Sequence, residues 1–464
     1  MKETKFKHTE VGMIPHDWNL VEISELAKDM ADGPFGSNLK KEHYTSDPQV
    51  RIIQLSNIGE CGWENENTKY TTFEHAKTIA RCIVSKEESI LVAKMMPAGR
   101  AIICPKTEKQ YILGSDVIRI TANEKLNSKY FVYATKSQAY LKQISDNTQG
   151  STRQRTSISK LRKIAMPLPI FKEQQRIANA LSDVDTLIAN LEKLIAKKKN
   201  IKQGAMQQLL TGKKRLPGFG SDKRTGSRPT DERRKECHSE RSAKREVEES
   251  SGYKMTELGL IPNDWEFVPV SELAKDMADG PFGSNLKKEH YTYDPQARII
   301  QLSNVGENGW EDENTKYTTF EHAKTIARCI VPKEESILVA KMMPAGRAII
   351  CPKKEKQYVL GSDVIRITAN EKLNSKYFVY ASKSDTYLKQ ISDNTQGSTR
   401  QRTSISKLRK ILILLPSLDE QTAIANILSD MDTEIDALEQ KLAKMRKIKQ
   451  GMMQELLTGK IRLK

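Results

Sequence analysis

The chain has 464 residues, enough for two to four domains with ordinary hydrophobic cores. Its 76 lysines and arginines exceed its 59 acidic residues, and the resulting net charge of +17 favours a polyanionic partner such as nucleic acid. No apolar run approaches the ~20 residues of a membrane span, and Met1–Asn19 is too polar for a signal peptide, so the sequence predicts a cytoplasmic protein without membrane contact.

Long stretches of the sequence occur twice. The two that repeat letter for letter are Ser24–Thr45, which returns as Ser271–Thr292, and Leu141–Ile164, which returns as Leu388–Ile411. Both stretches recur at the same offset of 247 residues, and the repeat runs from about Met13 to Lys213 without insertion or deletion. A repeat of this extent is a whole domain with its connection, rather than a solenoid unit of about 20 to 50 residues. One chain therefore carries two copies of one surface, which suits a target that is itself nearly two-fold symmetric.

The first part of each copy mixes short apolar runs with turn signals. Runs of β-branched residues such as Ile102–Ile103 and Val117–Ile120, bounded by glycine and proline, are typical of strands. Ser128–Ser145 has the pattern of a helix. The sequence therefore predicts a globular α+β domain in residues 1–169 and again in residues 253–416.

The second part of each copy carries an apolar residue at alternating steps of four and three, which is typical of a coiled-coil seam. The stripe consists of Ile177, Leu181, Val184, Ile188, Leu191 and Ile195 in copy one, and of Ile424, Leu428, Met431, Ile435, Leu438, Leu442 and Met445 in copy two. We predict long helices over 170–212 and 417–460, each roughly 55 Å long at ~1.5 Å per residue. The simplest arrangement packs them antiparallel, separating the two domains with pseudo-two-fold symmetry. The alternative is that each stripe packs only onto its own domain or onto a partner's helix.

Residues 213–252 join the two copies. This stretch is charged, contains glycine, serine and proline, and has almost no large apolar residue. It cannot bury a core, so we predict a flexible linker. A nucleic-acid-binding arm is the alternative, although its mixture of basic and acidic residues weakens that interpretation.

The sequence carries no motif of a known catalyst. There is no GxxxxGK[ST], no GxGxxG after a strand, no GxSxG, no HExxH and no carboxylate cluster of the nuclease type. The six cysteines include no close pair, and His43 and His75 lack partners at metal-binding spacing, so we expect reduced thiols and no metal site. We predict a non-catalytic chain that binds no cofactor.

Several polar segments instead have the residue types that contact DNA. Hydroxyl, amide and cationic side chains bond phosphates, arginine also reads guanine, and glutamine reads adenine. The candidates in copy one are Ser37, Asn38, Lys40, Gln54, Asn57, Lys94, Arg100, Ser151, Thr152, Arg153, Gln154 and Arg155. Their copies are Ser284, Asn285, Lys287, Gln301, Asn304, Lys341, Arg347, Ser398, Thr399, Arg400, Gln401 and Arg402. For each residue taken alone, a surface or turn-stabilising role remains the alternative.

The order of these segments resembles the specificity subunit of type I restriction-modification systems. The segments are DGPFGS, IIQLSNIG, ILVAKMMPAGRAIICP, LGSDVIRI, NTQGSTRQRTSISKLRKI and PLPIFKEQQRIANALSDVD, followed by QQLLTGKKRLPGF. The resemblance implies two target recognition domains held apart by two antiparallel helices, which read a bipartite site on double-stranded DNA. It also implies assembly with two methyltransferase subunits and with restriction and translocase subunits in host defence. S-adenosylmethionine, ATP and Mg²⁺ would then bind the partner subunits and serve DNA methylation and cleavage there.

The chain departs from this family in one respect. Family members usually have dissimilar recognition domains and similar helices, whereas here the domains are nearly identical and the helices differ. This reversal predicts a near-palindromic target.

Three other functions remain open: a coiled-coil interaction scaffold without DNA specificity, a specificity subunit of a methylation-only system, and a catalytic restriction-methylation polypeptide. The last needs an S-adenosylmethionine pocket and an Asn-Pro-Pro-type adenine site, and neither is evident in the sequence.

Overall fold

The computed structural model describes residues 5–34, 38–84, 89–147, 155–220, 252–256, 258–281, 285–332, 336–394 and 402–464. The chain divides into two compact units. Unit 1 consists of Met1–Lys193 with Glu439–Lys464, and unit 2 consists of Leu194–Leu438. Each unit holds one copy of the repeated domain together with a part of both long helices, α6 (Phe171–Leu209) and α13 (Leu418–Leu456).

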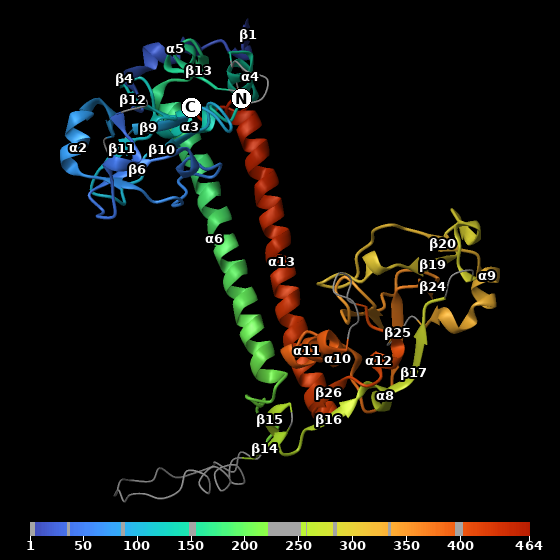
Figure 1. The fold of residues 1–464 in the computed structure, drawn as a ribbon. Coiled ribbons are helices and arrows are strands. Elements are labelled where there is room, and N and C mark those ends of the chain that lie inside the picture. The colour runs from blue at the N-terminus through green and yellow to red at the C-terminus, as the bar shows by residue number, and fades with distance from the viewer. Residues whose placement is uncertain are drawn as a thin grey trace, which may run out of the picture. The chain divides into compact units, whose positions relative to one another are not determined.

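A four-stranded antiparallel sheet forms the centre of the unit 1 domain (Figure 1), with the strand order β10-β9-β12-β4. Its strands are β4 (Ala27–Asp32), β9 (Ser89–Ala93), β10 (Ala101–Ile103) and β12 (Val117–Ala122). Successive side chains of a strand point to opposite faces. Ile90 and Val92 therefore belong to one buried cluster with the helices, while Leu91 and Ala93 belong to a second cluster with the other sheet.

That other sheet is mixed and has five strands, in the order β5-β7-β6-β11-β8. Its strands are β5 (Tyr44–Thr45), β6 (Val50–Ile53), β7 (Tyr70–Thr71), β8 (Ile83–Val84) and β11 (Tyr111–Leu113). Only the β6–β11 pair is parallel among the pairings described in this sheet. Almost all residues of β6 and β11 are covered on both faces, so these strands are continuous apolar runs apart from Arg51.

Helices cover the face of the four-stranded sheet that carries Ile90 and Val92. They are α1 (Ile23–Leu26), α3 (Ser128–Ala134), α4 (Gln138–Asn147) and α5 (Ile158–Arg162), while α2 (Phe73–Thr78) packs beside the five-stranded sheet. Two small antiparallel ladders complete the domain: β1 (Phe6–Thr9) with β2 (Gly12–Pro15), and β3 (Asn19–Glu22) with β13 (Ala165–Leu168).

Unit 2 repeats these elements in the same order. Its strands are β14 (Tyr253–Thr256), β15 (Gly259–Pro262), β16 (Glu266–Pro269), β17 (Ala274–Asp279), β18 (Tyr291–Thr292), β19 (Ala297–Ile300), β20 (Tyr317–Thr318), β21 (Ile330–Val331), β22 (Ser336–Ala340), β23 (Ala348–Ile350), β24 (Gln357–Leu360), β25 (Val364–Ala369) and β26 (Leu412–Leu415). Its shorter helices are α8 (Val270–Leu273), α9 (Phe320–Thr325), α10 (Ser375–Ala381), α11 (Asp385–Asp393) and α12 (Ile405–Leu408). The predicted pair of α+β domains is thereby confirmed.

The predicted strands are confirmed in β10 and β12, but the predicted single helix over Ser128–Ser145 is two helices, α3 and α4. The break has a local cause. The hydroxyl of Ser137 accepts a hydrogen bond from the backbone N–H of Tyr140 at 3.3 Å, which caps a new helix start. Ser384 does the same for Tyr387 in unit 2.

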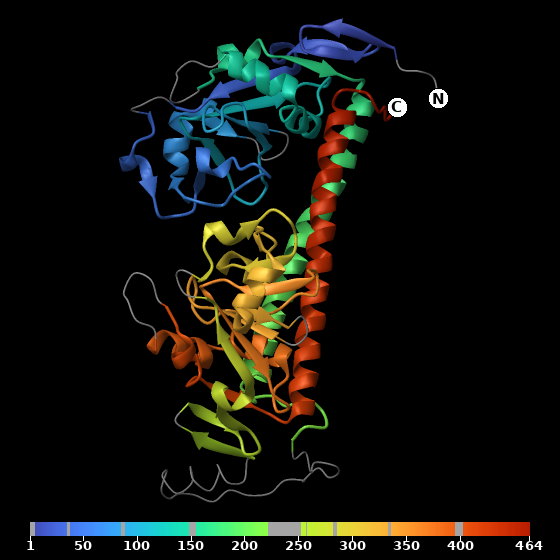
Figure 2. The same cartoon turned by 90° about the vertical axis from the view of Figure 1, so that its right-hand side faces the viewer.

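The two long helices run in opposite directions within each unit, as predicted. Figure 1 draws them next to each other, and Figure 2, turned by 90°, draws α6 partly behind α13. The ion pairs between them are Asp185–Lys449 (2.5 Å) and Glu192–Arg446 (2.7 Å) in unit 1, and Lys198–Glu434 (2.7 Å) and Lys202–Asp432 in unit 2. In each set the residue number rises along α6 as it falls along α13. The apolar stripe is shared: Ile177 and Leu181 pack into their own domain, whereas Leu191 and Ile195 are buried further along the helix.

The segment that follows each long helix packs into the domain of the other copy. Leu457 lies in the core of the unit 1 domain, and Leu210 lies in the core of the unit 2 domain. The predicted linker over 213–252 therefore begins too early. Arg215 bonds Glu420 and Asp264, and Leu216 packs against the unit 2 core. These residues are therefore part of the unit 2 domain and not of a linker. Residues 221–251 of the predicted linker lie outside the described residues.

Candidate nucleic-acid interface

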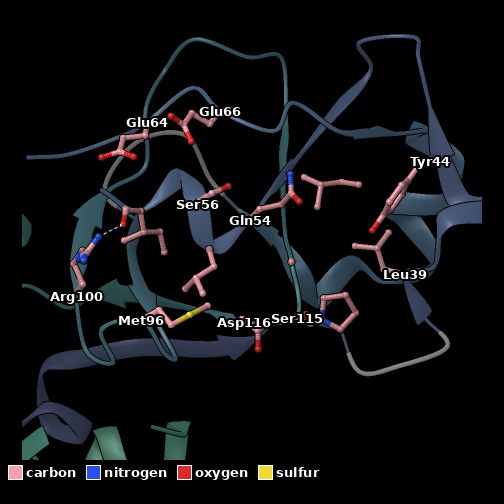
Figure 3. Close-up of a pocket in the computed structure, with 15 residues that line it drawn as sticks. Leu39, Tyr44, Gln54, Ser56, Glu64, Glu66, Met96, Arg100, Ser115 and Asp116 are labelled. Carbon is pink, nitrogen blue, oxygen red and sulfur yellow. Dashed lines mark hydrogen bonds between the residues drawn. The ribbon is translucent and has the colours of Figure 1, made fainter. Parts of the chain in front are cut away.

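An open cavity of about 630 Å³ lies where four loops of the unit 1 domain meet. Three of the loops follow β4, β6 and β11, and the fourth joins β9 to β10. Figure 3 shows the labelled side chains around it: Leu39, Tyr44, Gln54, Ser56, Glu64, Glu66, Met96, Arg100, Ser115 and Asp116. The structure thus brings the predicted residues Gln54 and Arg100 to one hollow.

Close backbone contacts hold these loops together. A Cβ on Gly33 would collide with the carbonyl oxygen of Gly114, and a Cβ on Gly114 would collide with that of Ile53. The backbone N–H of Gly33 donates to Val117 at 3.0 Å, and that of Gly114 donates to Ile53 at 2.8 Å. Gly33, the first glycine of the DGPFGS segment, is therefore required by the close approach of two loops.

Asn57 does not reach the cavity surface. Its side chain is fully buried, where its Oδ1 accepts a hydrogen bond from the backbone N–H of Gln54 at 2.8 Å. Its Nδ2 donates to the carbonyl oxygens of Glu64 (2.9 Å) and Glu66 (2.8 Å). Asn57 therefore holds the loop that presents Gln54, which is the turn-stabilising alternative left open for it.

Lys94 is also an internal residue, with a side chain that is 3% exposed. Its Nζ lies 2.7 Å from Oδ1 of Asp32 and donates to the carbonyl oxygen of Ser115 at 2.9 Å. The ammonium group thus joins the end of β4 to the loop after β11. Burial corrects the expectation that Asn57 and Lys94 contact DNA.

Two arginines stand at the cavity. Arg100 lines it and donates from Nη1 to the carbonyl oxygen of Ile58 at 3.0 Å. Arg155 pairs with the lining residue Asp116 at 2.9 Å, and its side chain is 48% exposed. The chain after Arg155 runs beside the β9–β10 connection, because the N–H of Thr156 donates to the carbonyl oxygen of Lys94 at 2.9 Å.

Asn38 and Lys40 flank Leu39 at another edge of the cavity. The carbonyl oxygen of Asn38 bonds Nε2 of His75 at 3.0 Å, and the N–H of Lys40 donates to Nδ1 of His43 at 3.0 Å. The two imidazole rings stack with their centroids 3.9 Å apart. The histidines therefore brace a loop that presents the exposed Lys40 side chain.

The remaining candidates cannot be placed. Those that lie outside the described residues are Ser37, Ser151, Thr152, Arg153 and Gln154, with their copies Ser284, Ser398, Thr399, Arg400 and Gln401. Each of these segments resumes next to the cavity, at Asn38 and Arg155 in copy one.

Unit 2 has the same site, a cavity of about 600 Å³ lined by Gln301 and Arg347. Asn304 and Lys341 are buried like their counterparts. Arg402 pairs with Asp363 at 2.8 Å, and Asn285 bonds His322 through its carbonyl oxygen as Asn38 bonds His75. Lys287 is exposed at the corresponding edge.

Sequence reasoning missed several residues of this surface, namely Tyr44, Glu64, Glu66, Met96, Ser115 and Asp116. Two features of the sequence could have pointed to some of them. One is the polar Ser-Asp dipeptide of the repeated LGSD segment, and the other is the methionine before proline in the MMPAG segment. Asp116 pairs with Arg155, and Glu64 and Glu66 line the same cavity as Arg100, so the surface offers both acceptors and cationic donors. Such a mixture suits base edges and phosphates together better than phosphates alone.

The described residues include no group of three or more histidine, cysteine, aspartate or glutamate side chains arranged to hold a metal ion. Burial raises the pKa of the Cys104 and Cys351 thiols to about 12, so both stay protonated at neutral pH. Among the helices of the described ranges, none combines the length and apolar character needed to cross a membrane.

Comparisons with known proteins agree with this architecture. A family model described as the type I restriction modification DNA specificity domain matches twice, at residues 15–203 and 262–447. The chain is 26% identical over 487 residues to the putative type I restriction enzyme MjaX specificity subunit of Methanocaldococcus jannaschii, covering 100% of this chain and 98% of that protein. It is 24% identical to the MjaVIII specificity subunit of the same organism, covering 100% and 97% of the two chains. The fold matches the S subunit of a type I restriction-modification system from M. genitalium with a TM-score of 0.54, at 17% identity over 95% of this chain and 96% of that one.

Proposed function

Because the chain belongs to the family of type I restriction-modification DNA specificity subunits, we propose that it recognises a bipartite, near-palindromic site on double-stranded DNA. The observation that carries the proposal is the presence of the same cavity and the same surrounding side chains in both units. Arg155 and Arg402 stand at equivalent positions, as do Gln54 and Gln301. Two equal readers in one chain suit two equal half-sites.

The chain's part in the complex is recognition and scaffolding. Two methyltransferase subunits and the restriction and translocase subunits would assemble on it, and S-adenosylmethionine, ATP and Mg²⁺ would act on those partners. The chain itself is non-catalytic and works in the cytoplasm. A methylation-only system, which lacks the restriction subunit, would use the same recognition surface.

The proposed contacts divide into two kinds. Arginine at a guanine contributes about 1 to 3 kcal/mol of discrimination, whereas a phosphate contact weakens binding to every sequence alike and lowers the salt slope by about one unit. Arg155 is half exposed and paired with a carboxylate that fixes its direction, which favours base reading. Lys40 is exposed on a flanking loop and favours phosphate contact.

The test is the affinity for the full site and for duplexes with one half scrambled, at two salt concentrations. Arg153→Ala with Arg155→Ala should weaken recognition of one half-site, and Arg400→Ala with Arg402→Ala should weaken the other by a similar factor. Arg446→Ala removes an exposed arginine on α13 and serves as the control for charge alone. If both double variants fold and bind like the parent at both salt concentrations, these segments do not read DNA.

A binding experiment also separates the other functions. A coiled-coil scaffold without DNA specificity would bind no duplex selectively from a random pool, with or without a methyltransferase partner. Selective binding that requires no ATP, followed by adenine methylation only when the partner is added, would support the proposed division of labour.

A further inference from the structure

The turn between β9 and β10 carries an exposed apolar tip, Met96–Pro97, at the mouth of the cavity. Met96 is 65% exposed and lines the cavity with Arg100 and Asp116 (Figure 3). The corresponding Met343 is 64% exposed in unit 2. Both methionines have a left-handed backbone, with φ of 54° and 55°, a region that few residues other than glycine adopt. Such backbones persist only where the surrounding structure enforces them, and they gather at functional sites.

The structure does enforce this one. Gly99, two residues after the tip, bonds Ala93 through its N–H at 2.8 Å, and its carbonyl oxygen accepts the buried Tyr140 hydroxyl at 3.0 Å. A Cβ on Gly99 would press on Ile144 of α4. The N–H of Ala93 donates to Arg100 at 2.8 Å, so the turn is closed at both ends. The tip is therefore a rigid projection from the core.

The side chains beside the tip are those that suit DNA. Arg155 reaches Asp116 on the same cavity wall, and in unit 2 Met342, next to Met343, forms a β-bridge with Arg402. Apolar residues such as Leu39 and Leu55 line the same cavity, but Met96 leaves 65% of its side chain exposed, so most of it is not used for packing. DNA-binding proteins insert methionine and proline between base pairs to unstack them.

We propose that Met96–Pro97 and Met343–Pro344 are apolar wedges, each of which enters the base stack of one half-site and unstacks one base step. This inference rests on the proposed DNA recognition and adds a mode of reading that depends on how easily a step deforms. Pyrimidine–purine steps unstack most readily, so each half-site would favour such a step beneath the tip even without hydrogen bonds to its bases.

The test places 2-aminopurine at each position of the target duplex, one at a time, and measures fluorescence at saturating concentrations of the full chain with its methyltransferase partner. Unstacking raises the fluorescence. We expect a severalfold rise at one position in each half-site that disappears from one half with Met96→Ala and from the other half with Met343→Ala. Met96→Leu should retain it, because leucine is also a wedge residue.

Met255→Ala is the matched control, since Met255 is 63% exposed but lies on β14, away from the cavity lining. A target adenine rotated out by the partner would fluoresce in every variant and reports that the complex is intact. A second readout is affinity: a mismatch at the wedge step should tighten binding of the parent by about tenfold and leave Met96→Ala with Met343→Ala unaffected.

Two results would overturn the wedge. The first is that Met96→Ala and Met343→Ala bind the site fully and give the same fluorescence as the parent at every position. The proposed DNA recognition would then remain valid without the wedge. The second is unchanged fluorescence together with loss of the methyltransferase partner, which would assign the tip to a protein contact. If the parent binds no duplex selectively, the proposed function itself fails and the wedge fails with it.

Discussion

Glu173 is a fully buried carboxylate whose partner comes from the last residues of the chain. Arg462 donates to it from Nε and Nη2, both at 2.8 Å, and Trp18 donates from its indole nitrogen at 3.2 Å. Arg462 also bonds Asp17 at 2.7 Å. Unit 2 repeats the arrangement with Glu420, Arg215, Trp265 and Asp264. A buried charge is tolerated only while such bonds surround it.

Removal of the arginine should therefore be costly. Arg462→Ala leaves Glu173 buried without its cation and should lower the free energy of unfolding of unit 1 by about 3 kcal/mol. Arg446→Ala breaks an exposed pair with Glu192 and should cost less than about 1 kcal/mol. Urea denaturation followed by tryptophan fluorescence measures both. Equal effects of the two substitutions would contradict the burial argument.

The same cluster predicts a response to acid. The hydrogen bond from Arg462 holds the pKa of Asp17 well below its usual range, and that from Arg215 lowers the pKa of Asp264. A carboxyl whose pKa is lower in the folded state stabilises the fold above its unfolded pKa, near pH 4, and loses that contribution as pH falls through the folded pKa.

The difference in melting temperature between the parent and Asp17→Asn should thus be constant from neutral pH to about pH 5 and should shrink below about pH 4. Asp17 is half exposed, so the difference is small. Asp47→Asn, at an exposed turn away from the cluster, is the control and should show no such change. A difference that grows as pH falls would reverse the sign argued here.

At the scale of elements, the long helices have two kinds of surface. Several residues that touch the domain are the same in both helices: Gln174 and Gln421 each bond backbone groups of their domain, and Asp185 and Asp432 accept the hydroxyls of Tyr133 and Tyr380 at 2.8 and 2.9 Å. Residues further along differ. The first turns of each helix are constrained by the surface of their own domain, and the last turns pack against the core of the other copy's domain, as Leu209 and Leu456 do. The middle turns need only complement the other helix.

We predict that the helix pair sets the spacer between the half-sites. Inserting four residues after Ala196 of α6 and four after Leu438 of α13 adds ~6 Å to each helix, about two base pairs of DNA. Both insertions fall between the ion pairs of unit 1 and those of unit 2, so each set keeps its register. The preferred spacer in a duplex library should change. The same insertion between Thr230 and Asp231 is the control, and an unchanged spacer in a folded, binding double insertion would refute the ruler.

At the scale of the whole molecule, the near identity of the two recognition surfaces, rather than the difference between the two helices, should set which bases the half-sites contain. The loops that line the cavity are nearly letter-identical in the two copies, so both should prefer the same bases. We therefore predict that methylated adenines in the source genome lie in an interrupted near-palindrome. Sequencing of modified adenines measures this directly. Two unrelated half-sites would mean that the few differing residues, such as Ser46 and Tyr293, decide specificity.

The sequence by itself determined the two α+β domains and the long helices to within a few residues, because repeat length and apolar period can be read directly from the order of residues. Predicted helices over 170–212 and 417–460 correspond to Phe171–Leu209 and Leu418–Leu456. Only the tertiary structure decided which of the polar candidate residues are exposed and which are buried. Lys94 is buried because its ammonium pairs with the carboxylate of Asp32, which is distant in sequence. Arg462 likewise pairs with Glu173, which lies 289 residues earlier in the chain. Burial and ion pairing depend on neighbours that folding brings from afar, and a local pattern does not encode them.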